Sequence, residues 1–226
     1  MKIIVANWKM NGDADLVSQF TETINPITTR NTVVVCPPIA LFENFHAFRY
    51  ALGAQNCFYE DKGAFTGENS PKLLKDIGFS YVIIGHSERR AIFGETDEIV
   101  HKKWQAAVRN GLKPIVCIGE KADERSQWME VLTKQIERFI GAELQDTIFA
   151  YEPVWSIGTG VIPTTGEIRE VLAFIKDKLG QNVPCLYGGS VNASNAESIL
   201  KIDTVDGLLI GGASLKPDEF AKIIEM

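Results

Sequence analysis

The chain has 226 residues, 45% of them hydrophobic and 23% charged, and its 23 Lys and Arg against 29 Asp and Glu give a net charge of −6. This composition is typical of a globular protein and excludes disordered and collagen-like chains. The negative charge argues against a general affinity for nucleic acid or for an anionic membrane surface. The sequence has no signal-peptide hydrophobic region and no long apolar span, so we expect a cytoplasmic protein.

Eight short apolar runs recur along the chain, each followed by a polar loop and an amphipathic stretch. The runs are nearly continuous rather than alternating, which is typical of parallel strands buried on both faces. We therefore predict eight strands. They cover Ile3–Ala6, Thr32–Cys36, Ala51–Asn56, Tyr81–Ile84, Pro114–Ile118, Thr147–Tyr151, Pro184–Tyr187 and Gly207–Ile210.

The stretches between the strands include four with helical spacing of apolar residues. In the first, Ile99, Val100, Trp104 and Val108 share one face. The predicted helices are Asp97–Val108, Trp128–Ile140, Leu172–Leu179 and Phe220–Ile224.

Eight alternations of strand and helix favour a closed (β/α)8 barrel of the α/β class. At about 28 residues per unit the barrel is near the small end of its range, so we predict one domain spanning residues 1–226. The alternative is an open, doubly wound sheet. A GxGxxG dinucleotide fingerprint would favour that alternative, but none follows the first strand.

The four cysteines lie in or beside apolar runs, and no two have the spacing of a zinc knuckle or a redox pair. We predict that all four are buried free thiols, which fits a reducing compartment. They are Cys36, Cys57, Cys117 and Cys185.

In such a barrel the functional residues follow the C-terminal ends of the strands. Lys9 follows the first strand, His86 the fourth and Glu152 the sixth. Alone, each has an ordinary explanation: a solvated lysine, a structural histidine, and a carboxylate that caps a helix or pairs with an arginine. Their coincidence at one end of the barrel favours a common site.

Glycine-rich turns follow the last two strands, at Gly188–Ser190 and Gly211–Ser214. Such turns let backbone N–H groups approach an anion, and this is the usual phosphate position in these barrels, although tight turns alone would also explain them. No nucleoside-triphosphate loop is present. The three histidines are scattered and no cluster has metal-ligand spacing, so we expect no metal.

The segment Pro153–Pro163 has proline at each end and a glycine-rich centre. Stiff ends around a mobile centre suit a lid over a site. The alternative is an ordinary surface loop with one packed side chain, Trp155.

The sequence resembles the triosephosphate isomerase family through seven motifs that occur in family order over nearly the whole chain. They are ANWKMNG at 6–12, GAFTGE at 63–68, IGHSERR at 84–90, PIVCIGE at 114–120, AYEPVWSIGTG at 150–160, YGGSV at 187–191 and VDGLLIGGASL at 205–215.

The resemblance implies the TIM-barrel fold and the interconversion of dihydroxyacetone phosphate and D-glyceraldehyde 3-phosphate without a cofactor, a step of glycolysis and gluconeogenesis. It implies Glu152 as the general base, His86 as the electrophile, Lys9 and Asn7 as electrostatic support, and Glu88 as a partner of the lysine. The phosphate-binding residues that it implies are Gly158, Ser190, Gly211 and Gly212.

The resemblance also implies a homodimer, in which the loop Gly63–Glu68 enters the neighbouring subunit beside Lys9. The rival is a monomer on which this loop packs against its own chain.

Two departures from the family pattern stand out. Val161-Ile162-Pro163 occupies the end of the lid where the family more often has Lys-Thr-Ala, and the chain is short. Proline fixes φ and biases the preceding residue toward extended backbone, so we expect a stiffer hinge.

Two other functions remain open from the sequence: a non-catalytic barrel that holds a phosphorylated metabolite, and another phosphosugar barrel enzyme, such as a relative of indole-glycerol-phosphate synthase. The first would be favoured by loss of Lys9, His86 or Glu152, and all three are present. The second would share the glycine-rich phosphate turns. It would not require the sequences NWK at 7–9, HSERR at 86–90 and EPVW at 152–155 together.

Overall fold

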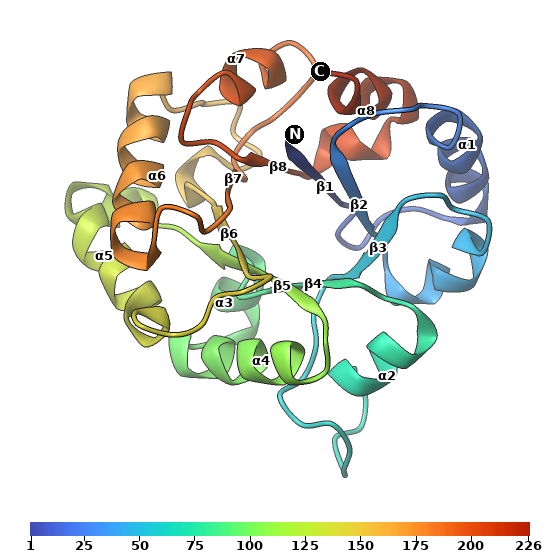
Figure 1. Cartoon of the computed structure of the whole chain (residues 1–226), viewed down its shortest axis with the longest axis horizontal. Helices are drawn as coiled ribbons and strands as arrows, with labels where there is room; N and C mark the ends of the chain where they lie inside the picture. Colours follow the sequence, from blue (N-terminus) through green and yellow to red (C-terminus); the bar gives the residue numbers. More distant parts are fainter.

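The computed structural model describes residues 1–226, whose eight strands form one closed parallel barrel in chain order, with β8 pairing back to β1 (Figure 1). Closure confirms the predicted (β/α)8 barrel, and the open sheet is wrong. The strands are β1 Ile3–Asn7, β2 Thr32–Cys36, β3 Ala51–Ala54, β4 Tyr81–Ile84, β5 Lys113–Ile118, β6 Ile148–Tyr151, β7 Cys185–Tyr187 and β8 Gly207–Ile210.

The helices form a ring around the barrel (Figure 1). None of them is long and apolar enough to cross a bilayer. They are α1 Ala14–Ile24, α2 Pro71–Ile77, α3 Ser87–Phe93, α4 Asp97–Arg109, α5 Trp128–Ile136, α6 Thr165–Leu179, α7 Ala196–Leu200 and α8 Pro217–Ile224. Short 3₁₀ segments complete the connections at Ile39–Phe45, Ala122–Gln127, Glu137–Phe139, Val154–Ser156 and Gly212–Leu215.

The buried side chains form two cores, because successive strand residues point to opposite faces. In β1, Val5 belongs to the core inside the barrel, whereas Ile4 and Ala6 belong to the core between barrel and helices. Both faces of the strands are therefore apolar, which explains the continuous apolar runs in the sequence. Polar residues of the barrel therefore lie at or just after the C-terminal ends of the strands.

Several predicted boundaries were wrong. Helix α6 begins at Thr165 rather than Leu172, because Thr164 and Glu167 form a capping box at its first turn. Helix α5 ends at Ile136 and continues as a 3₁₀ turn to Phe139, short of the predicted Ile140. Strand β3 ends two residues before the predicted Asn56.

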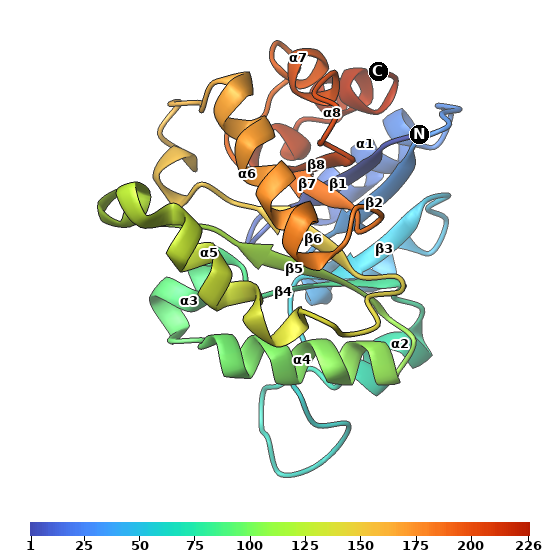
Figure 2. The ribbon, with the colours of Figure 1, turned by 60° about the vertical axis from the view of Figure 1, so that its left-hand side comes forward.

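The connection between β3 and α2 projects far from the body of the barrel (Figure 2). It contains Gly63–Glu68, the segment predicted to reach a neighbouring subunit. Its Phe65 ring lies 4.6 Å from the ring of Phe58 in the same connection, and Phe65 remains 42% exposed. Asp61 accepts hydrogen bonds from Arg109 and Asn110 at the end of α4.

All four cysteines are free and buried, as predicted. Burial disfavours the thiolate and raises the pKa of Cys57 and Cys185 to about 12, and it also raises the pKa of Cys36 and Cys117.

We therefore expect the native protein to react with an aromatic disulfide reagent at pH 8 about 10³-fold more slowly than a free thiol. All four thiols should react at the ordinary rate in guanidinium. Rapid labelling of one cysteine in the native protein would contradict this expectation.

Candidate active site

Three predicted side chains meet at the C-terminal end of the barrel. Asn7 ends β1, His86 lies two residues after β4, and Glu152 directly follows β6. All three are almost fully buried, with exposed fractions of 6%, 5% and 2%. The fold therefore brings together residues that are 145 positions apart in the chain.

The Glu152 carboxylate is held by two donors. Its Oε1 lies 3.0 Å from His86 Nε2, and its Oε2 accepts from the backbone N–H of Ser87 at 3.0 Å. Burial raises the pKa of Glu152, but His86, the Ser87 amide and Lys9 lower it by more. Glu152 is therefore an ionised carboxylate that is shielded from bulk water.

The His86 imidazole is neutral in this hydrogen-bond arrangement. It sits at the N-cap of α3, where the backbone N–H of Glu88 donates to Nδ1 at 3.2 Å. A nitrogen that accepts must carry a lone pair, so the ring hydrogen lies on Nε2 and points at Glu152. Burial lowers the pKa of His86, but the Glu152 carboxylate raises it by more and the Glu88 carboxylate adds to the rise, so the net shift is upward. Because Nδ1 accepts a hydrogen bond from the Glu88 N–H, it carries no hydrogen, and the imidazole is uncharged.

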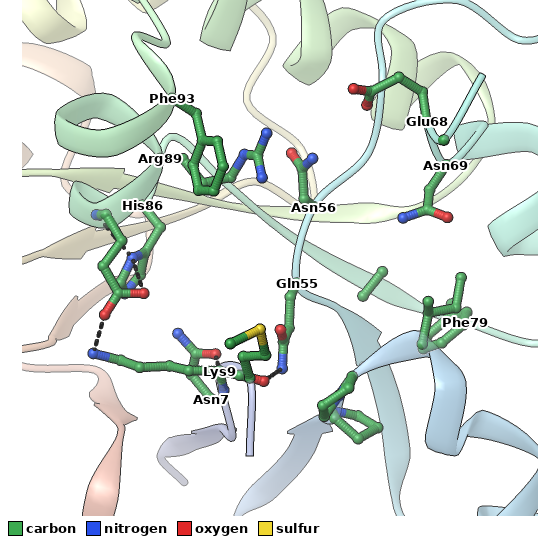
Figure 3. Close-up of a pocket in the computed structure, with 17 residues that line it drawn as sticks. Asn7, Lys9, Gln55, Asn56, Glu68, Asn69, Phe79, His86, Arg89 and Phe93 are labelled. Carbon is green, nitrogen blue, oxygen red and sulfur yellow. Dashed lines mark hydrogen bonds and ion pairs between the residues drawn. The ribbon is translucent and has the colours of Figure 1, made fainter. Parts of the chain in front are cut away.

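Lys9 has an unusual backbone that two amide side chains stabilise. Its φ of 53° is in the left-handed region, which is rare for a residue with a Cβ. Asn7 Oδ1 accepts from the Lys9 N–H at 3.1 Å, and Gln55 Nε2 donates to the Lys9 carbonyl at 2.7 Å (Figure 3). The Lys9 Nζ then lies 2.7 Å from Glu88 Oε1, so the predicted partner is in contact with the lysine.

Next to these groups lies a cavity of about 330 Å³. Its walls combine Lys9, His86 and Glu152 with the glycine-rich turns that follow β7 and β8. The structure therefore places the four predicted phosphate residues around the same cavity as the titratable groups. They are Gly158, Ser190, Gly211 and Gly212.

A second cavity of about 400 Å³ adjoins the first, with Lys9 and His86 at one end and Glu68 and Asn69 at the other (Figure 3). Glu88 also lines it. Lys9 and His86 therefore line both cavities, whereas Glu88 lines only the second.

The segment proposed as a lid is anchored at its first residues. Trp155 Nε1 donates to the buried Glu120 at 2.7 Å, and the Arg125 guanidinium lies 3.9 Å from the centre of the Trp155 ring. The centre contains Gly158 and Gly160 with φ near 71° and 76°, conformations that glycine adopts easily. Trp155 is packed, as an ordinary surface loop would also have it, and the segment lines the cavity through Gly158.

Sequence reasoning missed several residues that hold the site. Gln55 supports the Lys9 backbone, and the Ser87 amide holds Glu152. Gly119 lies where β5 meets β6, and a Cβ there would be 1.7 Å from the Glu152 carbonyl. Gly119 directly follows the predicted end of β5, so the rule that located Lys9 could have found it. Gln55 lay inside the predicted third strand, Ala51–Asn56, and became visible as a residue after β3 only because the strand ends at Ala54. No sequence signal identifies a particular backbone N–H.

No group of three or more His, Cys, Asp or Glu side chains is arranged to hold a metal ion.

Comparison with known proteins identifies the family of the chain. The family model of triosephosphate isomerase matches residues 2–226. The triosephosphate isomerase of Aquifex aeolicus is 42% identical over 242 aligned positions, covering 99% of this chain and 98% of the relative. That of Alkaliphilus oremlandii is 44% identical over 244 positions, covering 98% of each chain. Because these alignments exceed 226 positions, the relatives carry short segments that this chain lacks. The chain belongs to the triosephosphate isomerase family.

Proposed function

We propose that this chain interconverts dihydroxyacetone phosphate and D-glyceraldehyde 3-phosphate through an enediolate. The observation that carries the proposal is the convergence of an ionised carboxylate, a neutral imidazole N–H and an ammonium group on one cavity lined by glycine-rich turns. Family membership supports the same reaction.

In the proposed reaction Glu152 takes a proton from the carbon beside the substrate carbonyl and returns it to the neighbouring carbon. His86 donates its Nε2 hydrogen to the carbonyl oxygen as negative charge develops there, and then passes a proton between the two oxygens. The Lys9 ammonium stabilises the enediolate, and Asn7 holds the lysine backbone in place. No cofactor takes part in this scheme.

The substrate phosphate would lie against the turns that contain Ser190, Gly211 and Gly212, with Gly158 covering it from the lid. Glycines leave their backbone N–H groups accessible to phosphate oxygens. Closure of Pro153–Pro163 would exclude water and protect an intermediate that can otherwise lose phosphate.

A coupled assay with glyceraldehyde 3-phosphate, with and without phosphoglycolate, tests the proposal. Phosphoglycolate resembles the enediolate and should inhibit turnover competitively. Binding of phosphoglycolate without turnover would instead support a metabolite-binding barrel. Turnover of larger phosphosugars alone would support another phosphosugar enzyme.

The end of the lid provides a separate prediction. Replacing Val161-Ile162-Pro163 with Lys-Thr-Ala removes the fixed φ of Pro163 and should raise turnover about twofold to fivefold if opening of a stiff hinge limits the rate. The dependence of kcat on solvent viscosity should change with it. An unchanged rate and viscosity dependence would argue against a stiff hinge.

We also propose a homodimer through the Gly63–Glu68 loop. The projecting loop exposes Phe65, and the cavity of about 400 Å³ beside Lys9 offers a place for the loop of a second copy.

The dimer predicts one species of about 50 kDa in sedimentation at micromolar concentration, twice the 25.0 kDa of the chain. Replacing Phe65 with aspartate should shift it toward the monomer, because an ionised carboxylate is costly to bury. A single 25 kDa species for the unaltered chain would exclude the dimer.

We further propose a cytoplasmic location. The four free, buried cysteines support it, since unpaired thiols fit a reducing compartment.

A further inference from the structure

One arginine contacts both ends of the segment that would cover the substrate. Arg125 belongs to the 3₁₀ segment Ala122–Gln127 and lines neither of the two cavities beside Lys9. Its guanidinium lies 3.9 Å from the centre of the Trp155 ring, at the beginning of the lid. One of its N–H groups also donates to Glu167, in the first turn of the helix that follows the lid. The side chain therefore connects the beginning of the lid with the helix at its end.

At the first end, the Trp155 ring is held by two contacts. Its Nε1 donates to the buried Glu120 at 2.7 Å, and the Arg125 guanidinium covers the face of the ring. A cation over an indole face is a favourable contact, so it disfavours other orientations of the ring. The fixed ring restricts in turn the 3₁₀ turn Val154–Ser156, with which the lid begins.

At the second end, the two oxygens of the Glu167 carboxylate have different partners. Oε2 accepts from the Thr164 N–H at 2.7 Å and from the Thr164 hydroxyl at 2.9 Å, whereas Oε1 accepts from Arg125. The Thr164 contacts lower the pKa of Glu167 most and Arg125 lowers it further, so the carboxylate is ionised at neutral pH. The start of α6, directly after the end of the lid at Pro163, is therefore bound to Arg125.

We propose that Arg125 is a positioning residue that holds the two ends of the lid in place, so that only the tip moves when the substrate phosphate is covered. This inference rests on the proposed function. Without the bridge, the ends of the lid would sample several arrangements in the free protein, and ligand binding would have to select one of them. The apparent dissociation constant rises in inverse proportion to the fraction of molecules that are competent to bind.

The bridge predicts the order of phosphoglycolate affinities in three variants. Arg125→Gln removes both contacts and should weaken binding about threefold to tenfold. Glu167→Gln removes only the ion pair, because glutamine at this position can still cap α6, and it should weaken binding about twofold. Arg125→Lys keeps the charge beside Glu167 but loses the planar stack on Trp155, so its affinity should be intermediate. KM should rise with the dissociation constant while kcat changes less than about twofold, since the proton-transferring groups are untouched.

The sign of the Glu167→Gln effect separates the bridge from a simple charge effect. Phosphoglycolate is an anion, so by long-range charge alone the loss of Arg125 would weaken binding and the loss of the Glu167 carboxylate would strengthen it. The bridge predicts that both substitutions weaken binding. In the Arg125→Gln background, Glu167→Gln should have almost no further effect, because its partner is already gone.

The unaltered chain, the three variants and the double variant are compared by titration calorimetry at about 0.05 M and about 0.5 M KCl. The Arg125 and Glu167 side chains are 47% and 42% exposed, so salt screens their ion pair and the effect of Glu167→Gln should vanish at the higher concentration. Arg169→Gln is the matched control. It breaks an exposed ion pair of 2.9 Å with Asp203, also on α6, and should leave affinity unchanged.

Hydrogen exchange measured by mass spectrometry reports on the lid itself. Backbone amides of Pro153–Pro163 should exchange faster in ligand-free Arg125→Gln than in the unaltered chain, whereas those of α4 should not change.

Three results would overturn the positioning role: unchanged affinity in Arg125→Gln, a loss of affinity there without faster exchange in the lid, or tighter binding by Glu167→Gln. Failure of the proposed function is a different result, in which the unaltered chain neither binds phosphoglycolate nor turns over triose phosphate.

Discussion

Replacing Glu152 with aspartate is expected to lower kcat about 10²- to 10³-fold while KM and the affinity for phosphoglycolate change less than about threefold. The shorter side chain withdraws the carboxylate from the substrate carbon, which affects proton transfer in the transition state. The cavity, the glycine turns and Lys9 remain, so ground-state binding persists. Steady-state kinetics and inhibitor titration measure the two effects separately.

A matched control for this substitution is Glu22→Asp on the outer face of α1, which shortens an exposed carboxylate and should leave both constants unchanged. Equal turnover by Glu152→Asp and the unaltered chain would show that another group is the base. A parallel rise in KM and in the phosphoglycolate dissociation constant would instead assign Glu152 a role in binding.

The strands were predictable because the barrel buries both of their faces. The boundaries of β2, β4 and β8 agree with the prediction, since in each the apolar run ends where the buried strand ends. Where polar residues follow the apolar run, the predicted end was off by one or two positions: β1 continues to Asn7 instead of ending at Ala6, and β3 ends at Ala54 instead of Asn56. The end of a strand is set by hydrogen bonds to its neighbours as much as by burial.

The helices were less predictable, because their apolar periodicity depends on how much of each helix is covered. Helix α3 has no fully buried residue, and α7 has only five residues, so neither gives a clear helical pattern. Helix α1 does bury Val17, Phe20 and Ile24 and is capped by Asp13, so the sequence did contain its signal. The early start of α6 was likewise readable from the Thr164 and Glu167 capping box.

The site was predictable in its residue types and only partly in its geometry. The rule that polar residues follow barrel strands places Lys9, His86 and Glu152 at one rim, and the structure agrees. It cannot say that Glu88 donates its backbone N–H to His86, which decides that the imidazole is neutral. Such contacts depend on the orientation of a helix N-terminus relative to a neighbouring strand.

Lys9→Met is expected to lower kcat/KM about 10²- to 10³-fold, with most of the loss in kcat. The variant keeps the length of the side chain but removes the only ammonium group that lines the cavity. Charge that develops on the substrate oxygens would then be stabilised by the His86 N–H without a neighbouring cation. Steady-state kinetics at constant ionic strength measures the loss.

The ion pair between Lys9 and Glu88 raises another explanation for such a loss, because Lys9→Met also leaves the Glu88 carboxylate unpaired beside the cavity. The Glu88 side chain is 44% exposed, so water can solvate it and the unpaired charge should matter little. Adding Glu88→Gln to Lys9→Met should therefore raise kcat/KM less than about threefold above that of Lys9→Met alone. Recovery to near the unaltered rate would mean that repulsion by Glu88, and not the missing ammonium, caused the loss. A persistent loss assigns the stabilisation of the enediolate to Lys9 itself.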